Sequence, residues 1–485
     1  MLLSAALLCL AAAPFVALAI YRDPKLLIPL VVIGLPIEYF GTESLDTLGE
    51  SGIGGAIRAL LNPGKAAMLA TVVVGVMRLR WEPRRLIPDS SLLLPVFGFL
   101  ALMFLGVLWS DTLKAPNQVL ILPLYVAFLV VAPSMIEDRR DLERIFGAFL
   151  LVTIGLSLLA LAQRVSGVFN WRYILIQADE VTYRSNATFA DPNHLARYLA
   201  VSITLAVGLI LLTGPRRMTL YLAIPAVVLG LAASVATASR SGWLMVLFCG
   251  FLMVLFSPIS RYTRARILGA GAVFVLALVV ITLAQGGNEA ERIRSLTDST
   301  LVLGLREFLI KAGWAMWEDN PLVGVGSGNF QRALTTSYID ILPVWARTTL
   351  SHTSLISLLA ELGIVGIAMF ALVTIKTAIV VVRTRLRAAD PYVKMTITWL
   401  GIALLGILLQ SQSEGRLIDE PYIWLLLAMV VACETQRRFG AVAARAAQPE
   451  AARAEVRSSQ PAVPARGAGL PAGSPAAAVT GAGEH

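Results

Sequence analysis

The sequence has little charge for its length. Of its 485 residues, 15% are charged and 57% are hydrophobic. This leaves too little polar surface to cover a soluble globule of that size. Apolar runs of about 20 residues recur along the chain, so the composition excludes the soluble fold classes and predicts a polytopic membrane protein.

Cysteine and histidine are also scarce, with three residues of each. Cys9, Cys249 and Cys433 all lie inside apolar runs, with neither metal-ligand spacing nor plausible mutual pairing, which favours small buried hydrophobes. The pattern indicates no metal and no cofactor. The net charge of +9 would suggest nucleic acid in a soluble chain, but the excess lies in short loops beside apolar runs and implies no such partner.

The apolar runs mark thirteen candidate membrane spans, and we find neither an internal repeat nor a strand pattern of consequence. The candidates are 2–20, 26–40, 64–77, 91–109, 118–135, 145–163, 194–213, 219–237, 241–257, 266–284, 352–382, 396–411 and 419–435. The first run is interpreted as a retained span, because no Lys or Arg precedes it. We therefore predict an all-α polytopic protein with about 12–13 transmembrane helices, in which 26–40 is the segment most open to revision.

Loop charges predict the orientation of these spans. Short loops rich in Lys and Arg recur after every second span, which places them in the cytoplasm. The complementary loops then face outside, including a large loop, residues 285–351, with six Lys or Arg against seven Asp or Glu. Residues 436–485 are rich in Ala, Pro, Gly and Arg, which predicts a disordered cytoplasmic tail after a bundle formed by residues 1–435.

Two arginines lie in or beside the shorter external segments. Arg240 occupies a tight turn between two spans, where its fork of donors suits a phosphate or pyrophosphate; the alternative is an arginine that snorkels to lipid headgroups. Arg184 is a possible second phosphate contact. Asp191 or Asn193 is expected to cap the following helix, and His194 is expected to be an interfacial histidine with its hydrogen bonds satisfied.

The large loop contains a second group of candidates. Arg306 begins a segment with the apolar spacing of a surface amphipathic helix, although Arg306 and Lys311 are equally explained as its wet face. The cluster Gly324–Gly328 has no preceding strand and no following Lys-Ser/Thr pair, so it indicates a turn that lets backbone approach a neighbour or a ligand rather than an ATP site. Glu361 is expected to be a buried partner for a basic residue.

His352 stands where the large external loop meets an apolar run. Near arginines and in a low-dielectric surround, a histidine at such a junction is biased toward its neutral, basic form and can accept a proton. The alternative is a histidine at a helix start that bonds only to backbone.

Together these segments resemble the O-antigen ligase and polymerase superfamily. The resemblance covers roughly residues 180–375. It rests on Ala-Thr-Phe-Ala-Asp-Pro-Asn-His-Leu-Ala at 187–196, Ser-Arg-Ser-Gly-Trp at 239–243, Arg306 with Asn-Pro-Leu-Val-Gly-Val-Gly-Ser-Gly-Asn-Phe at 320–330, and His352 followed by Glu-Leu-Gly-Ile-Val-Gly.

The resemblance implies a GT-C-like helical bundle in the bacterial inner membrane, with its active site facing the periplasm. It implies transfer of a glycan from an undecaprenyl-pyrophosphate-linked donor to an acceptor hydroxyl, with lipid A-core as the favoured acceptor. Arg240 and Arg306, and less firmly Arg184, would bind the pyrophosphate, and His352 would be the base. The residues expected to support them are Asn193, Gly326 and Asn329. Two arginines can neutralise the leaving group without a metal, and direct attack would invert the anomeric carbon.

Other functions stay open at this point. The acceptor is lipid A-core for a ligase, another lipid-linked glycan for a polymerase, or a protein side chain for an O-oligosaccharyltransferase. From a different class, a lipid-linked oligosaccharide transporter would show paired broken helices or ionisable residues near the middle of the membrane. The sequence indicates few of either.

The orientation can be tested by labelling single cysteines from outside intact cells. We expect a cysteine at Ser337 to react, because the charge-balanced large loop is external, and one at Ala388 to be protected in a loop with four Lys or Arg between 383 and 394. The reverse labelling pattern would invert the topology and remove the candidate site from the periplasm.

Overall fold

The computed structural model describes residues 20–38, 62–79, 88–111, 119–167, 174–177, 180–213, 218–285, 305–341 and 353–435. The chain divides into two units, Met1–Arg437 and Arg438–His485, and every described residue belongs to the first. Almost all of the predicted span 2–20, and all of the predicted tail, lie outside the described residues. The disorder of that tail therefore stays a prediction.

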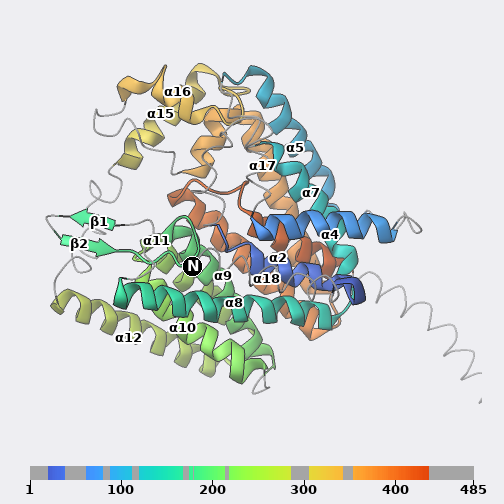
Figure 1. Cartoon of the computed structure of the whole chain (residues 1–485), viewed down its shortest axis with the longest axis vertical. Coiled ribbons are helices and arrows are strands. Elements are labelled where there is room, and N and C mark those ends of the chain that lie inside the picture. Colours follow the sequence, from blue (N-terminus) through green and yellow to red (C-terminus); the bar gives the residue numbers. More distant parts are fainter. Residues whose placement is uncertain are drawn as a thin grey trace, which may run out of the picture. The chain divides into compact units, whose positions relative to one another are not determined.

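Helices form most of the described chain, which confirms the predicted all-α class (Figure 1). The first helices are η1 (Pro24–Leu26), α2 (Leu27–Gly34), α4 (Pro63–Leu79), α5 (Leu93–Gly106), η5 (Val107–Trp109), α7 (Leu122–Val131), η6 (Ala132–Met135) and α8 (Arg139–Ser166). The next are α9 (Pro192–Thr213), the π-helical η7 (Thr219–Ala223), α10 (Ile224–Ala236), α11 (Arg240–Phe256) and α12 (Arg261–Gln285). The last are α15 (Leu305–Asp319), α16 (Phe330–Thr335), η8 (Ile339–Ile341), α17 (Ser354–Arg387), α18 (Pro391–Gln410), η10 (Ser411–Ser413) and a final helix, Pro421–Thr435.

Five helices in the described part of the chain are long and apolar enough to cross a membrane. They are Arg139–Ser166, Pro192–Leu212, Thr219–Ala236, Ser354–Arg387 and Pro391–Ser413. Shorter apolar helices occupy Pro24–Gly34, Leu93–Trp109, Leu122–Met135, Arg240–Phe256 and Pro421–Thr435. The chain is thus a multi-helix membrane protein, and the total of 12–13 spans stays a prediction.

The predicted span 26–40 does not form one continuous membrane-crossing helix. Its helix ends at Gly34, two residues before Pro36, since proline disfavours the helical conformation of the residue before it. Pro24–Gly34 is about 16 Å long at 1.5 Å per residue, about half of the hydrocarbon thickness. Asn62 joins this helix to α4: its side chain donates to Leu35 O and Ile37 O at 3.2 and 3.1 Å and accepts from the first amides of α4.

The structure also contains a β-hairpin that the sequence analysis missed. Strand β1 (Ile174–Gln177) pairs antiparallel with β2 (Glu180–Tyr183), with Ile174 opposite Tyr183 and Gln177 opposite Glu180. The strands are only four residues each, too short for a periodic signal to stand out, although Ile, Val, Thr and Tyr favour extended backbone. The hairpin lies in the predicted external loop and leads into Arg184.

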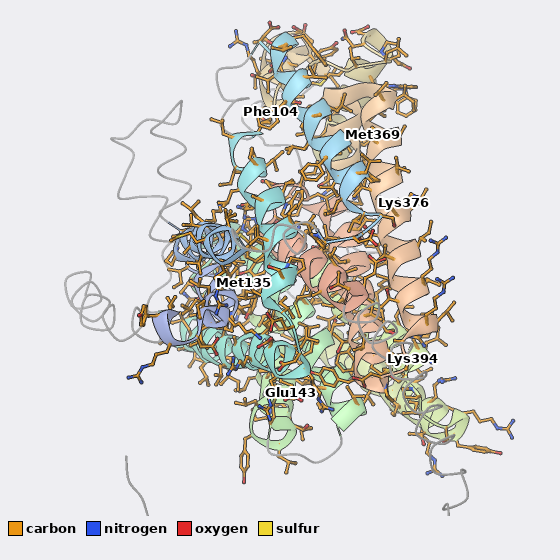
Figure 2. All side chains as sticks on the ribbon, turned by 90° about the vertical axis from the view of Figure 1, so that its right-hand side faces the viewer. Phe104, Met135, Glu143, Met369, Lys376 and Lys394 are labelled. Carbon is orange, nitrogen blue, oxygen red and sulfur yellow. The ribbon has the colours of Figure 1, made fainter. Side chains whose placement is uncertain are left out.

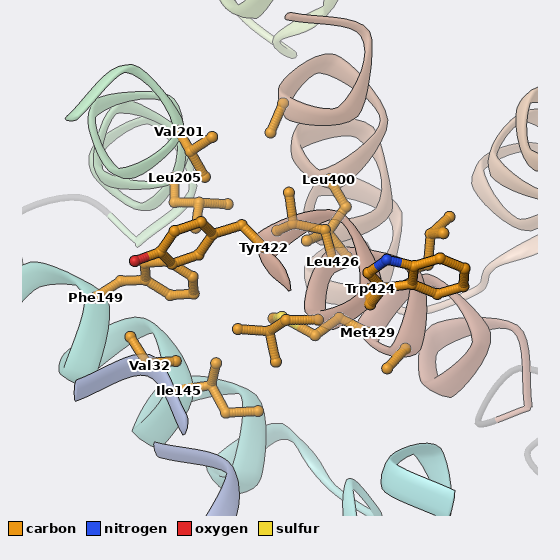
Figure 3. Packing of buried hydrophobic residues seen from close by; sticks show 14 of the residues in the cluster. Val32, Ile145, Phe149, Val201, Leu205, Leu400, Tyr422, Trp424, Leu426 and Met429 are labelled. Atoms are coloured by element: carbon orange, nitrogen blue, oxygen red, sulfur yellow. The ribbon is translucent and has the colours of Figure 1, made fainter. Parts of the chain in front are cut away.

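A large apolar core joins α8, α9, α18 and the final helix (Figure 3). Tyr198 of α9 stands between aromatic neighbours, 5.9 Å from the Phe149 ring and 5.4 Å from the Tyr422 ring. Gly208 lets Trp399 pack against α9, because a Cβ there would come within 2.3 Å of the indole. Aromatic stacking of this kind fixes how α9 faces the segment after α18.

Helix α5 packs along α17 (Figure 2). The Phe99 and Phe370 rings are 6.1 Å apart, and a Cβ at Gly98 would lie 2.8 Å from Met369 Cε, so the missing side chain allows the close approach. Small residues such as Gly98 at the interface are a common way for helices to approach closely in membranes.

Helix α17 is broken at Gly363, whose φ of 62° and ψ of −159° are accessible essentially only to glycine. The loop at 321–326 pairs with the backbone groups that the break sets free. Val325 and Gly326 donate to Ala360 O and Glu361 O at 2.9 and 3.0 Å, and Ile364 donates to Pro321 O at 2.9 Å. The predicted close approach of the glycine cluster to a neighbour is therefore confirmed, and the neighbour is α17.

We expect Gly363→Ala to destabilise the protein, because a Cβ there would meet backbone atoms of Leu322 and Val323 at 2.4–2.6 Å in a conformation that L residues avoid. The expected loss is at least ~1–3 kcal/mol, read as a fall in the unfolding temperature in detergent. Gly155→Ala is the matched control, since no atom lies within 4 Å of its Cβ position in α8. Equal melting of the two variants would contradict this account of the break.

Candidate functional site

Arg184, Asn193 and the turn before α11 lie together. Arg184 donates to Thr237 O at 3.0 Å and to Asn193 Oδ1 at 3.1 Å, and Ser239 Oγ donates to the same Oδ1 at 2.8 Å. Asp191 is the helix cap, since its carboxylate accepts from Asn193 N at 2.7 Å. The Asn193 side chain is thereby left to join Arg184 to the turn that carries Arg240.

Arg240 and Arg306 are also brought close to each other, although 66 positions separate them in the sequence. Arg240 is the first residue of α11, directly after the N-cap Ser239. Burial lowers the pKa of the Arg306 guanidinium, and the positive charge of Arg240 lowers it further. Both arginines remain cations at neutral pH, and an anion bound beside them would relieve this repulsion.

Arg306 is not part of a wet helix face. Lys311 is exposed and pairs with Glu307 at 2.7 Å, as expected for the solvent side of α15. Arg306 is instead half-buried and donates from Nη2 to Ser413 O at 2.8 Å. The amphipathic helix predicted here is confirmed, because Leu309, Ala312 and Met316 are buried on the side of α15 opposite Lys311.

The contact at Ser413 connects Arg306 with the start of α17. Ser354 Oγ donates to Ser411 O at 3.0 Å, and Leu355 N donates to Gln412 Oε1 at 3.3 Å. The same short segment thus holds Arg306 and the first turn of α17. His352 lies outside the described residues, and its role as a base stays a prediction.

Gly326 lies against the loop residue that follows η5, and Asn329 bonds within its own loop. A Cβ on Gly326, whose φ is 102°, would meet Ser110 at 2.7 Å. Asn329 donates to Val325 O at 2.8 Å, and its Oδ1 is buried with no hydrogen-bond partner among the described residues. These contacts show both residues shaping the loop, and their predicted support of the arginines stays a prediction.

Glu361 has a different partner from the one expected. Its Oε1 accepts the backbone N–H of Phe330 at 3.1 Å, at the start of α16, rather than a basic side chain. A carboxylate at that position satisfies an amide that the short helix leaves without an internal partner. No basic partner of Glu361 is found among the described residues.

The sequence analysis did not identify a buried ion network that involves the first turns of α9. Arg197 of α9 is 1% exposed; its Nη1 donates to Glu420 at 2.8 Å, and its Nη2 donates to Glu414. His194 Nε2 lies 2.6 Å from Glu414 Oε1, and its Nδ1 lies 3.1 Å from Glu38 Oε2.

Arg416 completes this network, donating to Glu38 Oε1 at 3.0 Å. One signal was available: Arg197 follows His194 by three residues, on the same face of an otherwise apolar helix. The partners come from positions 38 and 414–420, and no spacing in the sequence relates them to α9.

Electrostatics keep the network charged. Burial by itself would raise the pKa of Glu414, but the charges of Arg197 and His194 lower the pKa to about 2. Burial would likewise raise the pKa of Glu38, and Arg416 with His194 holds it well below its usual value. In the described part of the chain, no group of three or more His, Cys, Asp or Glu residues has metal-binding geometry. The carboxylates here are occupied by guanidinium and imidazole groups.

An apolar cavity of about 400 Å³ lies among α5, α11, α17, α18 and residues 417–427. Leu417 and Ile418, directly after Arg416, line it together with Leu408. Further along α17 and α18 its lining reaches Arg385 and Thr398, which hydrogen-bond to each other at 2.6 Å. Its lining suits a flexible hydrocarbon chain.

We expect the Glu414 ion contacts to stabilise the fold above its usual pKa of 4.5 and to be lost as the pH falls through the folded value of about 2. The sign follows from a depressed carboxyl pKa, because protonation is then easier in the unfolded chain. The unfolding temperature of the wild-type protein should fall between these pH values more steeply than that of Glu414→Gln. Parallel curves for the two proteins would contradict the assignment.

Comparison with known families gives one match. Residues 225–371 match the family model for O-antigen ligase, a segment that includes Arg240, Arg306 and His352 but begins after Arg184 and Asn193. The predicted resemblance to the O-antigen ligase and polymerase superfamily is thereby confirmed. A search of curated proteins finds no match.

Proposed function

Because residues 225–371 form an O-antigen ligase segment in a multi-helix membrane protein, we propose that this protein is a membrane-embedded glycosyltransferase. It transfers a glycan from an undecaprenyl-pyrophosphate-linked donor to an acceptor hydroxyl. The site faces the periplasm in the bacterial inner membrane, and the preferred acceptor is lipid A-core. The observation that carries the proposal is the pair Arg240 and Arg306, close enough for one charge to depress the pKa of the other.

The two arginines suit the departing pyrophosphate. As the acceptor oxygen attacks the anomeric carbon, the bond between that carbon and the phosphate oxygen breaks, and its electron pair stays on the pyrophosphate. Preorganised guanidinium groups stabilise this growing charge without a metal, and their planar forks match phosphate oxygens. Arg184 donates to Asn193 Oδ1 and Thr237 O and is the third candidate for this contact.

His352 is the proposed base that takes the proton of the acceptor hydroxyl. Support comes from its place within the family match and from the segment that follows it, since Ser354 and Leu355 are tied to the same 411–413 segment that receives Arg306. Attack from the face opposite the leaving group inverts the anomeric configuration, so no nucleophilic carboxylate is required.

The apolar cavity supports a lipid-linked donor. Its lining includes Leu417 and Ile418, directly after Arg416 in sequence, together with residues of α17 and α18, so it offers a hydrocarbon environment next to the ion network. A polyprenyl tail placed there would bury apolar surface while its headgroup stays with the arginines.

A transporter of lipid-linked oligosaccharides is the second candidate, because the structure contains a broken helix and a buried ion network. The break is closed by backbone pairing to residues 321–326, which favours the enzyme. Glycan transfer by the purified protein separates the two. For the acceptor, a strain lacking the protein should accumulate lipid-linked polymer for a ligase and single repeat units for a polymerase.

We expect His352→Ala to fold and to bind undecaprenyl pyrophosphate normally but to transfer glycan about 10²–10⁴-fold more slowly, because a general base contributes that much. Arg306→Ala should in addition bind the donor more weakly. The measurements are lipid binding, and turnover with purified donor and acceptor. Near-normal turnover of His352→Ala would place the base elsewhere or pass the proton to the pyrophosphate itself.

A further inference from the structure

Residues 410–416, here called the 410–416 turn, run from the last residue of α18 toward the final helix and contact Arg306, the first turn of α17 and α9. We infer that this turn is a positioning element: it sets Arg306 and the start of α17 in place relative to α9, and the ion pair between Arg197 and Glu414 anchors it. The inference rests on the proposed function. It assigns a role to charged residues that the family match does not cover, since that match ends at residue 371.

The turn offers acceptors to two segments of the site. Ser413 O accepts from Arg306 Nη2 at 2.8 Å, which fixes one nitrogen of the guanidinium and leaves the other donors for a ligand. Ser411 O and Gln412 Oε1 accept from Ser354 Oγ and Leu355 N in the first turn of α17. A shift of the turn would therefore displace Arg306 and the start of α17 together.

The anchor of the turn is ionic and buried. The Glu414 side chain is 6% exposed and lies between Arg197 Nη2 and His194 Nε2, both from α9. Gln410 adds a second link, accepting from Arg197 Nε at 3.1 Å and donating to Asn193 O at 3.4 Å. The side chain of that same Asn193 holds Arg184 and Ser239.

These contacts form one continuous path. It runs from Arg306 through the turn to α9, and from Asn193 to the residue before Arg240. Arg306 and Arg240 repel each other, so neither can hold the other in place. A fixed third element is needed, and the turn supplies it. Misplacement by about 1 Å in such a site is enough to cost a large factor in rate.

A purely structural role predicts a different result. Removing one partner of a buried ion pair destabilises a fold wherever the pair lies. A positioning role requires in addition that the loss of donor affinity depend on Arg306. This dependence can be measured by a double-mutant cycle, because residues coupled through one network give non-additive changes.

The experiment measures binding of undecaprenyl pyrophosphate to the purified full-length protein in detergent. We expect Glu414→Gln to weaken binding about tenfold in the wild-type background and less than about twofold in the Arg306→Ala background. Glu434→Gln is the matched control. Glu434 is another buried carboxylate, in the final helix, and it accepts a hydrogen bond from Ser90 Oγ at 2.7 Å. Its replacement should leave binding unchanged. Equal weakening by Glu414→Gln in both backgrounds, or none in either, would overturn the inference.

Gln412→Ala keeps the inference testable if Glu414→Gln fails to fold, because Gln412 lies outside the ion network. Loss of its contact with Leu355 N should slow glycan transfer at least about tenfold with undecaprenyl pyrophosphate binding unchanged. Wild-type turnover of Gln412→Ala would contradict the inference and leave the proposed function intact. Failure of the wild-type protein to bind undecaprenyl pyrophosphate would instead refute the proposed function itself.

Discussion

The buried ion network around Arg197 is the constraint on which the rest of this structure depends. Removing carboxylates and guanidinium groups from water costs several kcal/mol per ion, and only close pairing with full hydrogen bonding offsets it. Arg197 meets this condition with Glu414, Glu420 and Gln410, and Arg416 meets it with Glu38. The segment after α18 and the end of the α2 segment are thereby tied to one face of α9.

Once that face of α9 is fixed, the candidate site follows from it. The first turn of α9 carries Asn193, which gathers Arg184 and the turn leading to Arg240. In the 410–416 turn, the carbonyl oxygen of Ser413 accepts a hydrogen bond from Arg306. Cations from three separate elements thus share one region, although two of them repel each other. This arrangement of cations is the basis of the proposal that the site binds an anionic ligand.

The broken helix α17 solves a separate problem, which is how to join a polar loop to a membrane span. Gly363 interrupts the helix, and the loop at 321–326 supplies the hydrogen bonds that the interruption would otherwise leave unmade. In a membrane an unpaired backbone group costs several kcal/mol, so a break is tolerated only where protein covers it. Gly326 and Asn329 shape this same loop through their contacts with Ser110 and Val325.

The sequence by itself determined the membrane class, most helix positions and the resemblance to the O-antigen ligase and polymerase superfamily, because long apolar runs and local motifs are properties of neighbouring residues. It identified Arg184, Arg240 and Arg306 singly and predicted α15, and it failed where the outcome depended on distant partners. The contact of Arg306 with Ser413 overturned its wet-face explanation, and the buried ion network was missed, because both join segments far apart in the chain. Only the tertiary structure decided those pairings, since a buried charge is stabilised by whichever opposite charge the fold brings to it, and its position in the sequence does not reveal that partner.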